Sequence, residues 1–123
     1  MISQATPLVP AAASPAGVTA KFFRGLGDPT RVGILQLLMD GERTVGDLVE
    51  ETGVLQGRLS SHLACLRWCG FVSTRREGRR IYYRLADDRV PMLLSLAEEF
   101  LADNADSVDL CGVIDRRPDP DGS

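Results

Sequence analysis

Three cysteines are the side chains of this 123-residue sequence with the clearest capacity for chemistry: Cys65, Cys69 and Cys111. Cys65 and Cys69 lie four residues apart in a segment with helical periodicity, so their Cβ atoms are expected about 6 Å apart on one helix face. Two thiolates at that spacing can share one ion, because metal–sulfur bonds are about 2.3 Å or slightly longer. Thiolates prefer thiophilic ions to magnesium, calcium or manganese. The spacing favours a metal site, and the alternative is that the cysteines are small buried hydrophobic groups.

The compartment expected for this chain keeps its thiols reduced. No apolar run approaches the roughly 18 residues that span a bilayer, and residues 1–17 contain no basic residue, which argues against a secretory signal. We therefore expect a cytoplasmic protein without a membrane partner, in which an odd number of cysteines forms no disulfide framework. Cys111, a third thiol beyond the last predicted helix, favours metal binding over packing. Disulfide formation in response to oxidants or reactive sulfur is the second hypothesis.

Charge is distributed unevenly along the chain. The formal net charge is −3, with 14 basic and 17 acidic residues, which by itself argues against a nucleic-acid binder. The segment 58–84, however, carries seven arginines and one acid, Glu77, so its net charge is +6 and the remainder carries −9. A local basic stripe of this kind is typical of a phosphate-binding surface. A solvated face is the alternative, and the same segment disfavours a protein-interaction module without DNA.

Two short amphipathic helices predict a helix-turn-helix. Thr44 and Asp47 form a capping-box pattern that opens the first helix, and Gly53 ends it. The second helix, over about 56–69, has leucines at i, i+4 and i+7 that are expected to face the core: Leu59, Leu63 and Leu66. In a DNA-binding helix-turn-helix the second helix enters the major groove, so we interpret this one as the recognition helix.

A β-hairpin and a last helix complete the predicted domain. The hairpin covers about 71–85 with Gly78 at its turn, and this position after a helix-turn-helix makes it a wing. The last amphipathic helix, over about 88–104, is interpreted as the dimerisation helix. The predicted fold class is mainly α with a small β-hairpin wing, a homodimeric winged helix-turn-helix. The predicted parts are a disordered arm over 1–17, the winged helix domain over 18–104 and a tail over 105–123 that carries Cys111.

The side of the recognition helix opposite its leucines forms the predicted DNA-binding surface, together with the hairpin tip. Small and hydroxylated residues let the helix approach the groove closely, and its N-terminal end points toward the bases. Arginines at the hairpin tip are expected to follow a backbone or the adjacent minor groove. His62 is interpreted as a packed or phosphate-contacting residue rather than a metal ligand. The predicted DNA-binding residues are Gln56, Gly57, Arg58, Ser60, Ser61, His62, Arg75, Arg76, Arg79 and Arg80.

Several motifs, in their order and spacing, resemble one family of regulators. They are Asp28-Pro29-Thr30-Arg31, Ser60-Ser61-His62-Leu63 followed by Leu66, the exit Gly70-Phe71-Val72 and the Arg-Glu-Gly-Arg-Arg hairpin. Over about Val18 to Leu101 the sequence is similar to the ArsR/SmtB family of bacterial metal-responsive repressors. The resemblance implies a homodimer on double-stranded operator DNA, with the first and last helices at the interface and two recognition helices on a palindromic site.

Within that family, the cysteine pattern is most similar to the cadmium- and lead-sensing branch typified by CmtR. That branch joins two cysteines four apart in the recognition helix to one from the C-terminal tail, so the resemblance implies Cys65, Cys69 and Cys111 as ligands. Cd(II) or Pb(II) is the favoured inducer, with Hg(II) next and trivalent arsenic also in competition. The arsenic/lead site of other members needs cysteines where Thr44 and Gly46 stand here. The zinc site of the family needs histidines, of which this chain has one.

The predicted function is a transcriptional repressor whose apo dimer binds operator DNA and is released when a thiophilic ion binds the thiolates. Such a switch requires the ion to bind the DNA-incompetent form more tightly. A thiol-redox-sensing repressor without metal is the alternative. A small cysteine-dependent enzyme is a more distant one, because the sequence has no convincing Ser-His-Asp spacing and no phosphate loop, and a cysteine paired with His62 would share the recognition helix.

Overall fold

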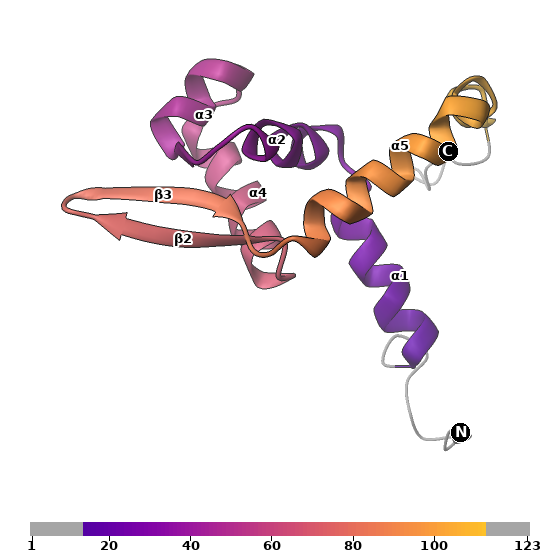
Figure 1. The fold of residues 1–123 in the computed structure, drawn as a ribbon, viewed down its shortest axis with the longest axis horizontal. Coiled ribbons are helices and arrows are strands. Elements are labelled where there is room, and N and C mark those ends of the chain that lie inside the picture. The colour runs from indigo at the N-terminus through magenta and orange to yellow at the C-terminus, as the bar shows by residue number, and fades with distance from the viewer. Residues whose placement is uncertain (1–13, 113–123) are drawn as a thin grey trace, which may run out of the picture. The chain divides into compact units, whose positions relative to one another are not determined.

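The computed structural model describes residues 14–112, which fall into two compact units, one up to Asp88 and one from Arg89 (Figure 1). The predicted fold class, mainly α with a hairpin wing, is confirmed. None of the helices in residues 14–112 is long and apolar enough to cross a membrane. The elements follow the order α1 (Pro15–Gly25), α2 (Pro29–Met39), β1 (Arg43–Thr44), α3 (Val45–Thr52), α4 (Gln56–Trp68), β2 (Val72–Glu77), β3 (Arg80–Leu85) and α5 (Arg89–Asp109).

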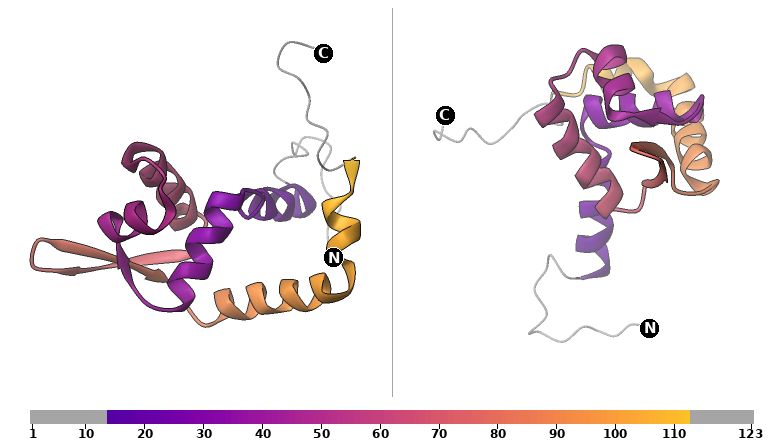
Figure 2. Two further views of the ribbon diagram at one scale, coloured as in Figure 1. Left: turned by 90° about the horizontal axis from the view of Figure 1, so that it is seen from above. Right: turned by 90° about the vertical axis from the view of Figure 1, so that its left-hand side faces the viewer.

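The wing is an antiparallel hairpin of β2 and β3 that projects beyond helices α2–α4 (Figures 1 and 2). Gly78 has a φ of +63° at the first of the two loop residues, as in type II′ turns, whose twist matches that of the strands. The short strand β1 adds to the outer side of β3 by pairing with Tyr82 and Tyr83, which gives the order β1-β3-β2. The sequence does not predict this third strand, because two residues are too few to show a period.

The core of the first unit is built by α2, α3 and α4. Its fully buried side chains are Ile34, Leu35, Leu48, Leu59, Leu63 and Leu66. The three leucines of α4 are therefore buried as their spacing predicts, and α4 is in contact with both α2 and α3. Burying one such side chain stabilises a fold by about 1.5–3 kcal/mol. The leucine stripe therefore fixes which side of α4 is turned outward.

Side-chain hydrogen bonds cap the first turns of α2 and α3. Asp28 caps α2, because its carboxylate accepts from the amides of Thr30 and Arg31 at 2.8 and 3.2 Å. The capping box of α3 is complete: the Thr44 hydroxyl accepts from the Asp47 amide at 3.1 Å, and the Asp47 carboxylate accepts from the Thr44 amide at 3.0 Å. These bonds fix the first residues of α2 and α3.

The first helix begins earlier than predicted. The sequence places residues 1–17 in a disordered arm and begins the winged helix domain at residue 18, whereas α1 begins at Pro15. The Ser14 hydroxyl accepts from the Gly17 amide at 3.0 Å, and proline at the first helical position loses no hydrogen bond. Serine followed by proline is thus a helix start here, and residues 1–13 of the predicted arm lie outside the described residues.

The last helix ends later than predicted. The sequence ends it at about Asn104, whereas α5 continues to Asp109, so residues 105–109 of the predicted tail are helical. The Asn104 side chain donates to the carbonyl oxygen of Phe100 at 3.1 Å. This bond pairs the side-chain amide within the helix, so Asn104 does not end α5. Residues 113–123 of the tail lie outside the described residues.

Several apolar residues of α5 are exposed, although Val90 and Leu94 near its start are buried. Leu96, Phe100 and Leu101 are 52%, 67% and 40% exposed in the single chain. The helix period correctly gives one apolar side, but a period alone does not say what covers it. Helix α1 also exposes large apolar side chains, namely Val18 and Phe23.

Candidate DNA interface and thiol site

The exposed side of α4 carries most of the residues predicted to contact bases. Its exposed positions include Gln56, Gly57, Arg58, Ser60 and Ser61. The Ser61 hydroxyl donates to the carbonyl oxygen of Gly57 at 3.2 Å, which keeps this side chain close to the helix. Leu55 precedes the helix without a side-chain cap, so the first amides of α4 are available to another acceptor such as a phosphate. This side of α4 has the small, polar surface that entry into a groove requires.

The tip of the wing carries three exposed arginines: Arg76, Arg79 and Arg80. Arg76 donates from Nε to the carbonyl oxygen of Gly78 at 3.2 Å. Within residues 14–112 none of the three forms an ion pair with a carboxylate. Their positive charge is therefore not neutralised by a paired carboxylate there, which suits them to contact the phosphate backbone.

Arg75, the fourth predicted arginine of the wing, has a different environment. Its guanidinium donates to Glu42 at 2.8 and 2.9 Å and to Glu77 at 2.8 Å, and it lies 4.7 Å from the ring centroid of Tyr82. The hydrogen bond to Glu42, followed by that to Glu77, raises the pKa of Arg75. The same bond from Arg75 lowers the pKa of Glu42. Arg75 is thus held midway along the wing, opposite Tyr82, and its charge is largely compensated by two carboxylates.

His62 is not on the exposed side of α4. Its ring is half-buried, with Nδ1 accepting from Nη1 of Arg31 at 3.2 Å. Nε2 is buried and has no hydrogen-bond partner among the described residues. This placement agrees with a packed histidine, one of the two roles expected from sequence, and differs from a phosphate contact.

Cys65 and Cys69 come together at the C-terminal end of α4. The amide of Cys69 donates to the carbonyl oxygen of Cys65 at 3.0 Å, so helical geometry extends to the second cysteine, and the two thiols are neighbours. Both side chains are half-buried. Burial raises the pKa of the Cys69 thiol, Cys65 raises it further, and the cations of Arg31 and Lys21 act in the opposite direction. A raised thiol pKa slows reaction with oxidants and makes ligation of an ion compete with a proton.

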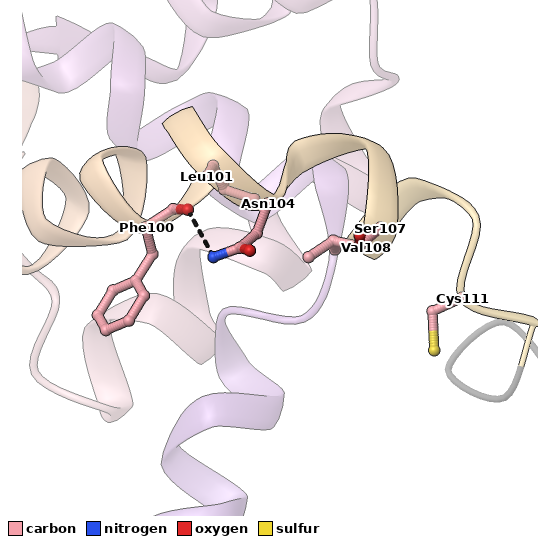
Figure 3. Close-up of a pocket in the computed structure, with 6 residues that line it drawn as sticks. All are labelled: Phe100, Leu101, Asn104, Ser107, Val108 and Cys111. Atoms are coloured by element: carbon pink, nitrogen blue, oxygen red, sulfur yellow. Dashed lines mark hydrogen bonds between the residues drawn. The ribbon is translucent and has the colours of Figure 1, made fainter.

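Cys111 belongs to the second unit, just after α5. It is a free, half-exposed thiol whose amide donates to the carbonyl oxygen of Val108 at 3.2 Å. Figure 3 shows it at one end of an open apolar hollow along the end of α5. The residues that line the hollow are Phe100, Leu101, Asn104, Ser107, Val108 and Cys111.

The donor set suits a thiophilic ion. Among residues 14–112 the structure gathers no group of three or more His, Cys, Asp or Glu side chains that could hold a metal. It does bring together two of the three predicted thiols, and each is a soft sulfur donor. A complete site needs at least one further ligand, and Cys111 offers the same chemistry.

Comparison with known proteins places the chain in a family. Residues 28–74 match the family described as bacterial regulatory protein, arsR family. A probable mercury resistance operon repressor of Streptomyces lividans is 50% identical over 93 residues, which cover 76% of this chain and 74% of that protein. The chain belongs to the ArsR family. The HTH-type transcriptional regulator CmtR of Mycobacterium tuberculosis is 41% identical to this ArsR-family chain over 88 residues, 71% of the chain and 75% of CmtR.

The fold agrees with that assignment. The solution structure of a homodimeric winged helix-turn-helix DNA-binding domain from Mycobacterium bovis is 34% identical, with a TM-score of 0.68 over 85% of this chain and 92% of that one. As an ArsR-family protein the chain is a DNA-binding transcriptional regulator, and the hypothesis of a small cysteine-dependent enzyme is wrong. The resemblance stated from the sequence motifs is confirmed.

Two residues of the site region have roles that the sequence does not reveal. Glu42 neutralises Arg75 from 33 positions away, and Arg31 contacts His62 from 31 positions away. Periodicity and capping patterns detect only neighbours along the chain. No local signal therefore identifies these partners.

Proposed function

We propose that this ArsR-family protein is a metal-responsive repressor, in which the apo homodimer binds operator DNA and ligation of a thiophilic ion by cysteines releases it. The observation that carries the proposal is the thiol pair Cys65–Cys69 at the end of the helix whose exposed side is expected to contact DNA. A site on that helix couples ligand binding to DNA binding directly, provided that the ion binds the DNA-free form more tightly.

The apolar surfaces of α1 and α5 support a homodimer. Phe23 of α1 and Met92, Leu96 and Phe100 of α5 are each more than half exposed in the single chain. Apolar surface of this kind marks interfaces in soluble proteins. The related winged helix domain from Mycobacterium bovis is a homodimer, and a symmetric dimer suits an operator with two equivalent half-sites.

The DNA contact is proposed to use the exposed side of α4 in the major groove and the wing tip on the backbone. The residues proposed for base and groove contacts are Gln56, Gly57, Arg58, Ser60 and Ser61, and those for the backbone are Arg76, Arg79 and Arg80. Arg75 and His62 are proposed to support this surface without contacting DNA, since both are already bound to other residues.

The proposed ligands are Cys65, Cys69 and Cys111. These cysteines would hold the ion as thiolates, and their protons would be released to solvent. Cd(II) and Pb(II) are candidate ions through the resemblance to the CmtR branch, and trivalent arsenic remains a competitor. Hg(II) is supported by the 50% identity to a probable mercury resistance operon repressor. Cys111 is proposed to complete the site either within one chain or from the second copy.

A single titration tests this function. The reduced, metal-free protein is titrated with Cd(II), Pb(II), Hg(II), Zn(II) and As(III) while sulfur-to-metal charge-transfer absorption and binding to a fragment of the protein's own promoter are followed. We expect saturation near about one ion per subunit and loss of DNA binding with one of the thiophilic ions. Cys65→Ser and Cys111→Ser should lose the absorption and the release, whereas Ser107→Ala, beside Cys111, should keep both.

Two results would contradict the proposal. The first is an absence of thiolate absorption with every ion. The second is a Cys65→Ser, Cys69→Ser protein that binds DNA and is still released by each ion. Free thiols counted before and after mild peroxide separate the redox hypothesis, which predicts their loss together with release of DNA.

A further inference from the structure

One arginine side chain joins three helices of the winged unit. Arg31, in the first turn of α2, donates from Nε to the carbonyl oxygen of Gly25 at 2.7 Å and from Nη2 to that of Arg24 at 3.2 Å. Both acceptors lie in the last turn of α1. The third nitrogen, Nη1, donates to Nδ1 of His62 in α4 at 3.2 Å. The guanidinium therefore ties the C-terminal end of α1 to the recognition helix, and its planar fork matches acceptors in several directions.

The histidine end of this link has no competing hydrogen bond. Since arginine only donates, Nδ1 of His62 is the acceptor. Its other nitrogen, Nε2, is buried without a hydrogen-bond partner in the described part of the chain. The contact with Arg31 is thus what orients the ring there.

The same end of α1 lies against the thiol pair. Gly25 is buried, and a Cβ built on it would lie 3.7 Å from Sγ of Cys69 and 3.6 Å from the ring of Phe71. The sulfur of Cys69 consequently packs on the last residue of α1, next to the carbonyl oxygen that Arg31 binds. A shift of that sulfur changes a contact with α1 directly, because packed interiors transmit displacement rather than absorb it.

We propose that Arg31 is a positioning residue that carries ligation at Cys65 and Cys69 to α1; the inference rests on the proposed function. Arg31 holds α1 and α4 together, so that when the thiols close on an ion and Sγ of Cys69 moves against Gly25, the end of α1 moves with the recognition helix. Helix α1 exposes Phe23, part of the proposed dimer surface. The signal from one pair of thiols thereby reaches the second copy, which sets the spacing of the two recognition helices.

The test separates coupling from binding. Arg31→Gln removes the charged fork, and Arg24→Gln is the matched control, because its side chain carries the same charge one helix away and only its backbone oxygen takes part in the link. For each protein we measure ion affinity by charge-transfer absorption, and DNA affinity without and with saturating ion. A metal-independent readout is hydrogen exchange at the Leu26 and Gly27 amides, which bond to carbonyl oxygens of the last turn of α1.

We expect Arg31→Gln to keep the ion affinity of the DNA-free protein within about threefold and to lower the ion-induced change in DNA affinity by about tenfold, within the usual range of coupling between sites. Exchange at the Leu26 and Gly27 amides should accelerate in the metal-free variant. Arg24→Gln should match the wild type in all three measurements. If Arg31→Gln does not fold, Arg31→Lys, which keeps the charge but loses the fork, and His62→Gln are held to the same expectations.

The inference is overturned if the Arg31 variants release DNA by the same factor as the wild type. It is equally overturned if they lose only apo DNA affinity while that factor stays unchanged, since this is the result for a phosphate contact or a simple structural cap. A wild-type protein that gives no thiolate absorption with any ion would instead overturn the proposed function, and the inference with it.

Discussion

The winged helix unit and helix α5 differ in the exposure of their large apolar residues, which form a buried core in the first and an exposed stripe on the second. In the winged unit the large side chains of α2, α3 and α4 meet each other, and Leu48, Leu59 and Leu66 have no measurable exposure. In α5, Met92, Leu96 and Phe100 recur every four residues and are 67%, 52% and 67% exposed. One unit completes its core within a single chain, whereas the other presents an apolar stripe that suits a second copy.

This difference assigns separate tasks to the two units. The winged unit holds the proposed DNA surface and the thiol pair Cys65–Cys69 on a core that needs no partner. The stripe on α5 sets the proposed assembly, because an uncovered apolar helix side is stabilised only by association. Changes in the core of the first unit should alter folding itself, and changes in the stripe on α5 should alter behaviour that depends on protein concentration.

The largest effect is expected from breaking the core of the winged unit. Leu63→Ala removes a side chain that is 1% exposed and should lower the free energy of unfolding by about 2–5 kcal/mol, through lost burial and the cavity left behind. Urea denaturation at one fixed protein concentration measures it. Leu55→Ala, at a position 80% exposed, is the control and should change stability by less than about 0.5 kcal/mol. Equal losses for both variants would refute the assignment of the core.

Breaking the stripe on α5 should have the next largest effect. Phe100→Glu places a charge on the proposed dimer surface and should weaken dimerisation by about tenfold or more for each of the two copies, since burying a phenylalanine stabilises by about 1.5–3 kcal/mol. Sedimentation over a range of concentrations measures it. The winged unit should stay folded, as judged by circular dichroism. Glu98→Ala, two residues earlier and on the other side of the helix, should leave the dimer intact; an unaffected dimer in Phe100→Glu would place the interface elsewhere.

The sequence predicts best those features of the winged unit that depend on residues close together in the chain. The capping box of Thr44 and Asp47 and the leucine stripe of α4 both depend on residues within one or two turns, and both are confirmed. Strand β1 escapes because its two residues gain their structure only from pairing with β3. The start of α1 escapes because Ser14-Pro15 stands in a stretch whose composition alone suggests disorder.

In the candidate site, too, the sequence predicts what depends on neighbouring residues and misses what depends on distant ones. The spacing of Cys65 and Cys69 correctly predicts two adjacent thiols, because four residues on a helix fix their separation. The sequence also finds the arginines of the wing, but it does not distinguish Arg75 from Arg79. That distinction depends on Glu42, which approaches Arg75 only in the folded chain.

A smaller effect is expected on DNA affinity, whose dependence on salt should distinguish Arg79 from Arg75. Arg79→Gln removes an exposed charge and should reduce the slope of log affinity against log salt by about 0.9 for each phosphate that the variant no longer neutralises. Arg75→Gln should lower affinity with little change in that slope, because Glu42 and Glu77 already compensate its charge. Titrations of operator DNA at several salt concentrations measure both. Equal slope changes in the two variants would show that Arg75 contacts phosphate as well.

The smallest effect is expected on the stability of the winged unit in acid, through the carboxylate of Asp28 that caps α2. Burial alone would raise the pKa of Asp28, but hydrogen bonds from the Arg31 and Thr30 amides outweigh it and the pKa is lowered. Because the folded value lies below the unfolded one of about 3.9, the ionised carboxylate favours the fold. Its contribution is complete above that unfolded value and is lost as the pH falls through the folded one.

Asp28→Asn keeps a capping oxygen but cannot ionise, so the variant should be slightly less stable at neutral pH and should lose less stability below about pH 4. Urea denaturation from pH 7 to pH 3 measures both curves. They should converge in acid, because protonation of the wild type removes the charge that the variant already lacks. Parallel curves over the whole range would mean that the pKa of the Asp28 carboxylate does not change on folding, and that other carboxylates dominate the loss of stability in acid.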